Sequence, residues 1–274
     1  MENNKIIIEP KQGWQKIDWN ELWSYKDLFF FLIWRNIKTR YAQSILGIGW
    51  ALIQPLFSMI IFTIIFGNIA KVSSDGVPYA IFSFTALVPW TYFTSALMDS
   101  SGSLINSTQL LTKVYFPRLV IPIAPVISKL VDFFLALIIL FFLMIYFGFY
   151  PKMKLFILPI LILLMMLSAS GMGMWLTALA IQYRDIKYSM GFFVQLLMYL
   201  APVVYPASAI PIEYRVLYGC FPMTGVIEGF RSILLETNPI PWDLIIPGFI
   251  IAFVLFFSGL FYFIRMEKRF ADVA

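Results

Sequence analysis

Residues 155–183 read LFILPILILLMMLSASGMGMWLTALAIQY, and no side chain in this stretch carries a charge. A helix rises about 1.5 Å per residue, so the stretch is long enough to cross the roughly 30 Å hydrocarbon core of a bilayer. Because hydrocarbon offers backbone N–H and C=O groups no partners, a segment this apolar must form a helix there. The stretch therefore predicts a transmembrane helix.

Five further charge-free stretches divide the rest of the chain. The six together are Ala42–Ala70, Gly76–Met98, Phe133–Pro151, Leu155–Tyr183, Tyr188–Ile212 and Leu244–Ile264. Hydrophobic residues make up 61% of the 274 positions and charged residues 13%, about half the usual charged share of a globular protein. We therefore expect an all-α, polytopic membrane protein with six transmembrane helices in one domain, residues 42–274. Its task should concern something that crosses the bilayer.

The distribution of lysine and arginine orients the predicted spans. With the amino terminus placed inside, fourteen of the 20 basic residues lie on inside segments and Lys129 lies within a span. The outside segments hold only five, namely Lys71, Lys152, Lys154, Arg215 and Arg231. This asymmetry follows the positive-inside rule. We expect both termini in the cytoplasm, and a net charge of +5 that reflects lipid orientation and not nucleic-acid binding.

The sequence lacks the residues that several kinds of chemistry require. The chain has no histidine and one cysteine, Cys220, so it cannot form a His/Cys zinc site or an internal disulfide and has no histidine general base. The sequence contains no Gly-x-x-x-x-Gly-Lys-Ser/Thr phosphate loop, so the chain does not bind ATP by that device. We expect neither a cofactor nor enzymatic activity on this chain. Unidirectional transport would need another subunit or an ion gradient.

The chain before the first span predicts a cytoplasmic segment, residues 1–23, and an amphipathic interface helix, residues 24–41. The sequence SYKD at 24–27 has the form of a helix capping box. Phe29, Leu32 and Ile33 would face the acyl chains and the basic residues the headgroups. The helix either anchors the chain or also gathers an anionic headgroup through Arg35 and Arg40, because guanidinium groups suit phosphate.

The longest inside loop, residues 99–117, mixes polar residues with Leu104, Ile105, Leu110 and Leu111. Short amphipathic helices here would form either a local cover or a docking element for a soluble partner. In the span that follows, Pro122 and Pro125 predict a kink. Lys129 and Asp132 stand three residues apart, which favours a structural ion pair near the interface over a transport site. Small residues at 168–173 predict close packing of the fourth span.

The outer region, residues 205–242, contains two apolar stretches of roughly ten residues, which are too short to cross a bilayer. They meet at PMTG, residues 222–225. We expect two half-helices that enter the membrane and return, forming either a gate or an ordinary extracellular cap. The candidate gate residues are Pro222, Met223, Thr224, Gly225, Glu228 and Arg231, with the last two spaced to pair on one helix face.

The chain carries an ordered set of short motifs: RYAQSILGIGWA at 40–51, LVPW at 87–90, LTKVYFPR at 111–118, YRDI at 183–186, PVVYP at 202–206, PMTG at 222–225 and EGFR at 228–231. From about Tyr25 to the carboxyl end, the order and spacing of this set resemble the permease subunit of bacterial O-antigen polysaccharide ABC exporters. No single motif is decisive, but the ordered set is specific.

The resemblance implies a homodimer in the bacterial inner membrane that carries two copies of a cytoplasmic ABC ATPase, which binds ATP and Mg²⁺. A channel between the protomers would pass a polysaccharide linked to undecaprenyl diphosphate. The resemblance also implies a coupling helix at about 101–112 and a re-entrant outer gate at about 212–235. For Leu104, Ile105, Leu110 and Leu111, the resemblance favours a docking role with the ATPase over a local cover of the bundle.

A channel that lets sugars slide should use aromatic faces. The candidates are Phe62, Phe66, Tyr92, Phe93 and Tyr199, although aromatic residues also pack against lipid and neighbouring helices. Three alternatives remain open: a permease for a related glycopolymer such as capsule or teichoic acid, a permease for small lipids or drugs, and an intramembrane enzyme acting on polyprenyl-linked sugars. The paired acids or histidines that such an enzyme prefers are missing.

Overall fold

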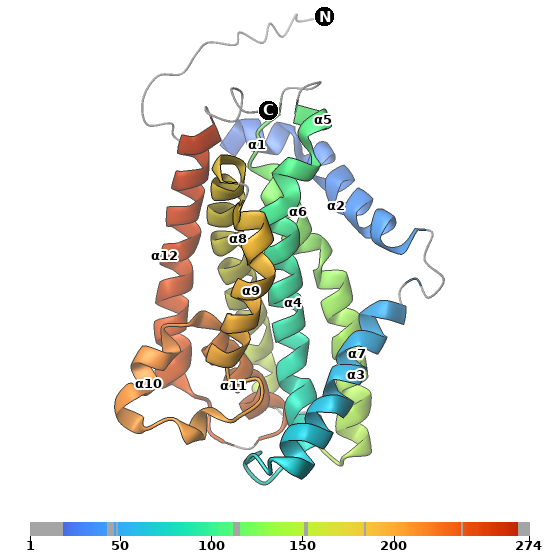
Figure 1. The fold of residues 1–274 in the computed structure, drawn as a ribbon, viewed down its shortest axis with the longest axis vertical. Coiled ribbons are helices and arrows are strands. Elements are labelled where there is room, and N and C mark those ends of the chain that lie inside the picture. The colour runs from blue at the N-terminus through green and yellow to red at the C-terminus, as the bar shows by residue number, and fades with distance from the viewer. Residues whose placement is uncertain are drawn as a thin grey trace, which may run out of the picture.

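The fold of the chain is a bundle of helices (Figure 1). The computed structural model describes residues 19–42, 47, 49–111, 116–150, 153–183, 185–236 and 238–267. Within these ranges all regular structure is helical. Five helical segments are long and apolar enough to cross a membrane: 49–69, 79–106, 120–146, 153–182 and 242–267. The polytopic helical architecture predicted from the sequence is confirmed.

The chain runs back and forth between the two ends of the bundle (Figure 1). The elements that run along the bundle are α3 (Gly49–Phe62) with the π-helix η1 (Thr63–Ile69), α4 (Tyr79–Asn106), α6 (Val120–Ser128) with α7 (Leu130–Tyr146), η2 (Met153–Ile157) with α8 (Leu158–Gln182), α9 (Asp185–Leu200) and α12 (Trp242–Glu267). At about 1.5 Å per residue, the 16 residues of α9 rise roughly 24 Å, which is less than a hydrocarbon core. Helix α9 is not among the five candidate spans, so the expected count of six depends on this shorter helix.

The core of the bundle is built around α4, which packs against α3, α6, α7, α8 and α11. Close approach of α8 to α12 depends on small residues. A Cβ on Gly171 would lie 2.6 Å from the backbone nitrogen of Phe256, and a Cβ on Gly259 would lie 2.5 Å from the carbonyl oxygen of Gly171. The small-residue patch therefore packs within the bundle, as its sequence predicts.

The third span is broken in two. Helix α6 ends at Ser128 and α7 begins at Leu130, with Lys129 in the turn between them. Pro125 lacks a backbone N–H and interrupts the ladder within α6. Pro122 and Pro125, for which the sequence predicts a kink, precede this interruption, and Lys129 lies at it.

The interface segment consists of α1 (Trp19–Ser24) and α2 (Lys26–Tyr41), which lie across one end of the bundle, near the end of α12 (Figure 1). The predicted capping box is wrong, because Ser24 ends α1 and Tyr25 stands at the start of α2 without a side-chain cap. The predicted lipid-facing side is also wrong. Leu32 is 2% exposed and packs with Val120 and Ala124 of α6, and the exposed apolar side chains are Trp23, Phe30, Phe31 and Trp34.

The inside loop is less separate from the bundle than its sequence suggests. Helix α4 continues through residues 99–106, and only the short α5 (Thr108–Leu111) follows it. Residues 112–115 lie outside the described residues. Much of the predicted coupling segment is therefore the end of a long membrane helix.

The opposite end of the bundle carries two short helices joined at Cys220 and Phe221. They are α10 (Ile212–Gly219) and α11 (Pro222–Leu234), preceded by the short η3 (Ala207–Ala209). Helix α10 is exposed, with Ile212 84% and Leu217 71% exposed. All residues of α11 are buried. The two half-helices expected at about 212–235 are present, and they differ sharply in burial.

Candidate functional site

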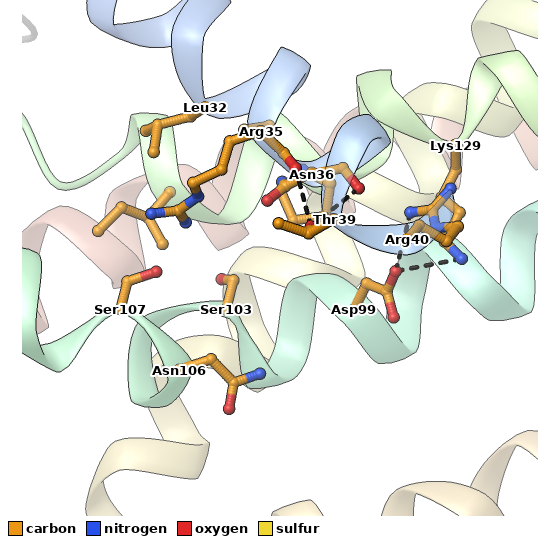
Figure 2. Close-up of a pocket in the computed structure, with 13 residues that line it drawn as sticks. Leu32, Arg35, Asn36, Thr39, Arg40, Asp99, Ser103, Asn106, Ser107 and Lys129 are labelled. Atoms are coloured by element: carbon orange, nitrogen blue, oxygen red, sulfur yellow. Dashed lines mark hydrogen bonds and ion pairs between the residues drawn. The ribbon is translucent and has the colours of Figure 1, made fainter. Parts of the chain in front are cut away.

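A polar pocket of about 480 Å³ lies between α2, α4 and α6, at the end of the bundle that carries α2. Helix α2 contributes Arg35, Asn36, Thr39 and Arg40, and α4 contributes Asp99, Ser103 and Asn106 (Figure 2). Lys129 lies at the break of the third span, and Leu32, Ser107, Ile121, Ala124 and Pro125 complete the lining. Residues far apart in the sequence thus form one charged cavity.

One end of this pocket is an ion-pair network that joins three helical elements. Arg40 Nη1 lies 2.7 Å from Asp132 Oδ2, and Arg40 Nη2 lies 3.3 Å from Asp99 Oδ2. Lys129 Nζ lies 3.1 Å from Asp99 and 3.8 Å from Asp132. Two cations therefore face two carboxylates, and the network is close to neutral.

Tyr41 extends the network by donating its hydroxyl to Asp132 Oδ1. Burial, and then the hydrogen bond to Asp132, raise the pKa of Tyr41 to about 12, so the phenol keeps its proton at neutral pH. The end of α2 is thus attached both by charge and by a neutral donor. This supports the structural interpretation of the Lys129–Asp132 pair.

Arg35 lies toward the other end of the pocket. No carboxylate among the described residues pairs with its guanidinium group. Facing it in the pocket are Ser103 and Ser107, whose side chains Figure 2 shows directed toward the Arg35 side. The hydroxyl of Ser103 is buried and has no hydrogen-bond partner within the described ranges. Within the described part of the chain, the pocket therefore combines a cation that has no acidic partner with a hydroxyl that has no hydrogen-bond partner.

At the end of the bundle opposite α2, a buried arginine connects α11 to two other parts of the chain. Arg231 is 1% exposed and its Nη1 lies 2.8 Å from Glu228 Oε1. Its guanidinium also donates to the carbonyls of Val203, at 2.9 Å, and Tyr205, at 3.3 Å, and lies 3.5 Å over the ring of Phe82 in α4. We call this arrangement of Arg231 and its contacts the outer clamp.

Glu228 completes the outer clamp by accepting the backbone N–H of Ala207 at 3.0 Å. The two charged residues thus fix the irregular chain that follows α9 against α11 and α4. The Glu228–Arg231 pairing predicted from the i, i+3 spacing is confirmed. Its carbonyl contacts had no signal in the sequence.

Asp75, which lies between the first and second spans, connects the loops at this same end of the bundle. Its two carboxylate oxygens accept from Ser208, at 2.8 Å, and from the side chain of Asn238, at 2.9 Å. A smaller pocket of about 270 Å³ opens beside this contact and is lined in part by Arg215, Glu228 and Asp243. Arg215 and Asp243, 3.0 Å apart, connect α10 to the start of α12.

Comparison with known proteins places this bundle in a family. Residues 27–235 match the family model described as "ABC-2 type transporter". The chain belongs to the ABC-2 type transporter family. The match begins in α2 and ends directly after α11, so it includes both the pocket and the outer clamp.

The relatives of this ABC-2 transporter include permeases of polysaccharide export systems. It is 27% identical to the "O-antigen export system permease protein RfbA" of Myxococcus xanthus over 79% of this chain and 83% of the relative. It is also 27% identical to a protein of the same name from Klebsiella pneumoniae, over 90% and 95%. The "Polysialic acid transport protein KpsM" of Escherichia coli is 25% identical, over 74% and 80%.

The five candidate channel aromatics of this ABC-2 transporter fall into two groups. Phe62 and Phe66 lie half-buried on the first span, with ring centroids 5.5 Å apart, and Tyr199 on α9 is 65% exposed. Tyr92 and Phe93 are 3% and 0% exposed in the core of the protomer. The hydroxyl of Tyr92 donates to the carbonyl of Val126 at 2.9 Å. Tyr92 and Phe93 therefore present no free face at the surface of the chain.

The candidate coupling residues also divide by burial. Leu104 is 2% exposed and belongs to a buried cluster with Phe263 of α12. Leu110 packs partly against the same cluster, and Ile105 is half-buried. The side chain of Leu111 lies outside the described residues. Leu104 thus faces the bundle and not a soluble partner.

All six candidate gate residues lie on α11 and are buried. Backbone contact with α12 leaves no room for a side chain at Gly225, where a Cβ would lie 2.7 Å from the carbonyl oxygen of Leu244. Thr224 Oγ1 is buried without a hydrogen-bond partner among the residues that the structure describes.

The sequence did not identify Asp99, Ser103 and Tyr41 as site residues, because a lone polar residue next to a span has no distinguishing pattern.

Proposed function

We propose that the chain is the membrane-spanning subunit of an ABC exporter that moves a polysaccharide linked to undecaprenyl diphosphate out of the cytoplasm. The observation that carries this proposal is the similarity to O-antigen export permeases over most of both chains. O-antigen is therefore the proposed polysaccharide. Capsule export is the second candidate, supported by the polysialic acid transport relatives, whose match covers less of this chain.

The proposed exporter needs a second protein to supply energy. No ATP-binding motif is present in the sequence, so we assign ATP and Mg²⁺ to two copies of a separate cytoplasmic ATPase. The end of α4 and α5 form the proposed contact with it, through Ile105, Leu110 and Leu111. Replacement of Ile105 by aspartate should reduce co-purification of the ATPase, whereas normal co-purification and export would refute the docking role.

The proposed channel lies between two copies of the chain in the inner membrane. Two observations on the exposure of helices support this position. Among the residues of α3 and η1 only Pro55 is buried, and α9 exposes Phe192, Leu196 and Tyr199. These apolar faces would form the seam of the homodimer, with Phe62, Phe66 and Tyr199 as sliding surfaces for sugar rings.

The outer gate in this proposal is α10 and not the buried α11. Helix α10 is exposed and is attached to α12 through the Arg215–Asp243 pair. Helix α11 is held by the outer clamp and by backbone contact with α12. A gate must move with little loss of buried contact, which favours α10.

The direct test is complementation of a bacterial strain that lacks its O-antigen export permease. The chain is produced together with an ABC ATPase subunit from the same organism, and surface O-antigen is measured as a lipopolysaccharide ladder. Restoration that requires both proteins supports the proposal. Restoration only in a capsule-export mutant would transfer the function to capsule export, and activity without any ATPase would refute the exporter assignment.

A further inference from the structure

We propose that the pocket between α2 and α4 binds the phosphate group of a lipid through Arg35, Ser103 and Ser107. This inference rests on the proposed function only in naming the lipid diphosphate of the substrate as one source. The phosphate of an anionic bilayer phospholipid is the other. Both present the same oxygen acceptors, and the same donors would recognise them.

The first argument is the free charge of Arg35. Its neighbour along α2, Arg40, is already engaged by Asp99 and Asp132 at 3.3 and 2.7 Å. Arg35 lines the same pocket but has no acidic partner in the described part of the chain. A guanidinium group lacking a carboxylate presents its forked donors to whatever enters, and that geometry suits phosphate.

The second argument is the hydroxyl of Ser103. Ser103 is 7% exposed, and its Oγ is buried without a hydrogen-bond partner among the described residues. Buried polar groups are nearly always hydrogen-bonded, and an exception needs an explanation. Figure 2 shows this side chain and that of Ser107 directed into the pocket opposite Arg35. A phosphate between them would accept from both hydroxyls and from the guanidinium.

The third argument is the division of charge within the pocket. At one end, Arg40 and Lys129 are balanced by Asp99 and Asp132. The end of the pocket with these ion pairs is therefore structural. Arg40 holds α2 in place there and does not bind the anion. The positive charge that remains belongs to Arg35 at the other end. Arg35 and Arg40 lie on the same helix and line the same pocket, but their different partners give them different roles.

The size and walls of the pocket fit a lipid headgroup. Its volume of about 480 Å³ lies within the range of about 300–1,000 Å³ usual for ligand sites. Leu32, Ile121, Ala124 and Pro125 give it an apolar side. The exposed aromatic residues Phe30, Phe31 and Trp34 on α2 would keep that helix at the membrane surface. A lipid could thus place its phosphate in the pocket and its chain in the bilayer.

The test is a binding measurement on the purified full-length chain in detergent. The probes are farnesyl diphosphate, phosphatidylglycerol and, as an uncharged lipid, diacylglycerol, and binding is followed by tryptophan fluorescence. We expect Arg35→Gln to weaken diphosphate binding by at least about tenfold and Arg35→Lys to weaken it less, because lysine keeps the charge but not the fork. Lys38→Gln is the matched control. Lys38 is exposed and lies on α2 outside the pocket, so this substitution removes one positive charge from the same helix without changing the pocket.

The Ser103→Ala variant distinguishes an effect on phosphate binding from an effect on folding stability. Because the Ser103 hydroxyl has no partner within the described ranges, its removal should leave the thermal stability of the lipid-free protein unchanged or higher. Binding of farnesyl diphosphate should nevertheless fall by several-fold. A variant that lost stability and binding together would indicate a structural role and would overturn the assignment of Ser103.

The two phosphate sources give different outcomes. Arg35-dependent binding of farnesyl diphosphate alone assigns the pocket to the substrate headgroup, and equal binding of phosphatidylglycerol assigns it to a bilayer lipid. The proposal is overturned if no phosphate probe binds, or if Arg35→Gln and Lys38→Gln weaken binding equally. Failure of the complementation test would remove the export function and leave these binding results intact.

Discussion

The guanidinium Nη1 of Arg231 lies 2.8 Å from Glu228 Oε1, one turn earlier on α11, and the two side chains are 1% and 9% exposed. A charge pair this deeply buried is costly to assemble, and removal of one partner leaves the other uncompensated. Three backbone carbonyls, those of Phe82, Val203 and Tyr205, also depend on the arginine. The pair therefore controls how the outer end of the bundle is held.

Replacement of Arg231 by methionine should destabilise the protein by about 3–5 kcal/mol, because Glu228 would remain buried and charged without a partner. Glu228→Gln should cost less, since the amide oxygen can still accept from Arg231 and from Ala207. Thermal unfolding in detergent measures both variants. Equal stability of the wild type and Arg231→Met would contradict the outer clamp.

A methyl group at Gly171 should separate α8 from α12. The added Cβ would lie 2.6 Å from the nitrogen of Phe256, and overpacking of this kind costs about 1–3 kcal/mol. Gly191→Ala in α9 is the control, since nothing lies within 4 Å of its added Cβ, and it should be neutral or gain up to about 1 kcal/mol from helix propensity. The prediction fails if the two variants unfold at the same temperature.

Arg40→Gln should loosen the attachment of α2 to the bundle. The substitution removes charged contacts to Asp99 and Asp132, and hydrogen bonds to charged groups contribute about 1.5–3 kcal/mol each. Limited proteolysis near α2 should become faster, whereas Lys38→Gln should leave the rate unchanged. An unchanged rate for Arg40→Gln would show that the ion-pair network does not hold the helix.

The candidate aromatic residues should separate into two phenotypes. Tyr199→Ala, at a 65% exposed position, should lower export of polysaccharide without lowering the amount of protein in the membrane. Phe93→Ala should instead destabilise the protomer by about 3–5 kcal/mol, because Phe93 is fully buried. Export is measured per membrane-inserted protein, and normal export by Tyr199→Ala would remove that residue from the proposed channel surface.

The membrane class, the helical content and most element positions follow from the sequence alone. Absence of charge over a long stretch is a local property, and the surrounding hydrocarbon then leaves the backbone only one solution. The same holds for Glu228 with Arg231, because a spacing of three residues places both side chains on one helix face. Such features need no knowledge of how distant segments pack.

Only the tertiary structure decided the partners and burial of individual side chains. Arg40 meets Asp132 and Asp99 across 92 and 59 residues of sequence, and Arg35, five positions earlier, meets neither. Leu32 turns toward α6, Leu104 toward α12, and Tyr92 and Phe93 into the core. In a membrane helix an apolar side chain is equally suited to lipid and to protein. Hydrophobic pattern therefore identifies the helices, and the packing between them determines which face each helix presents.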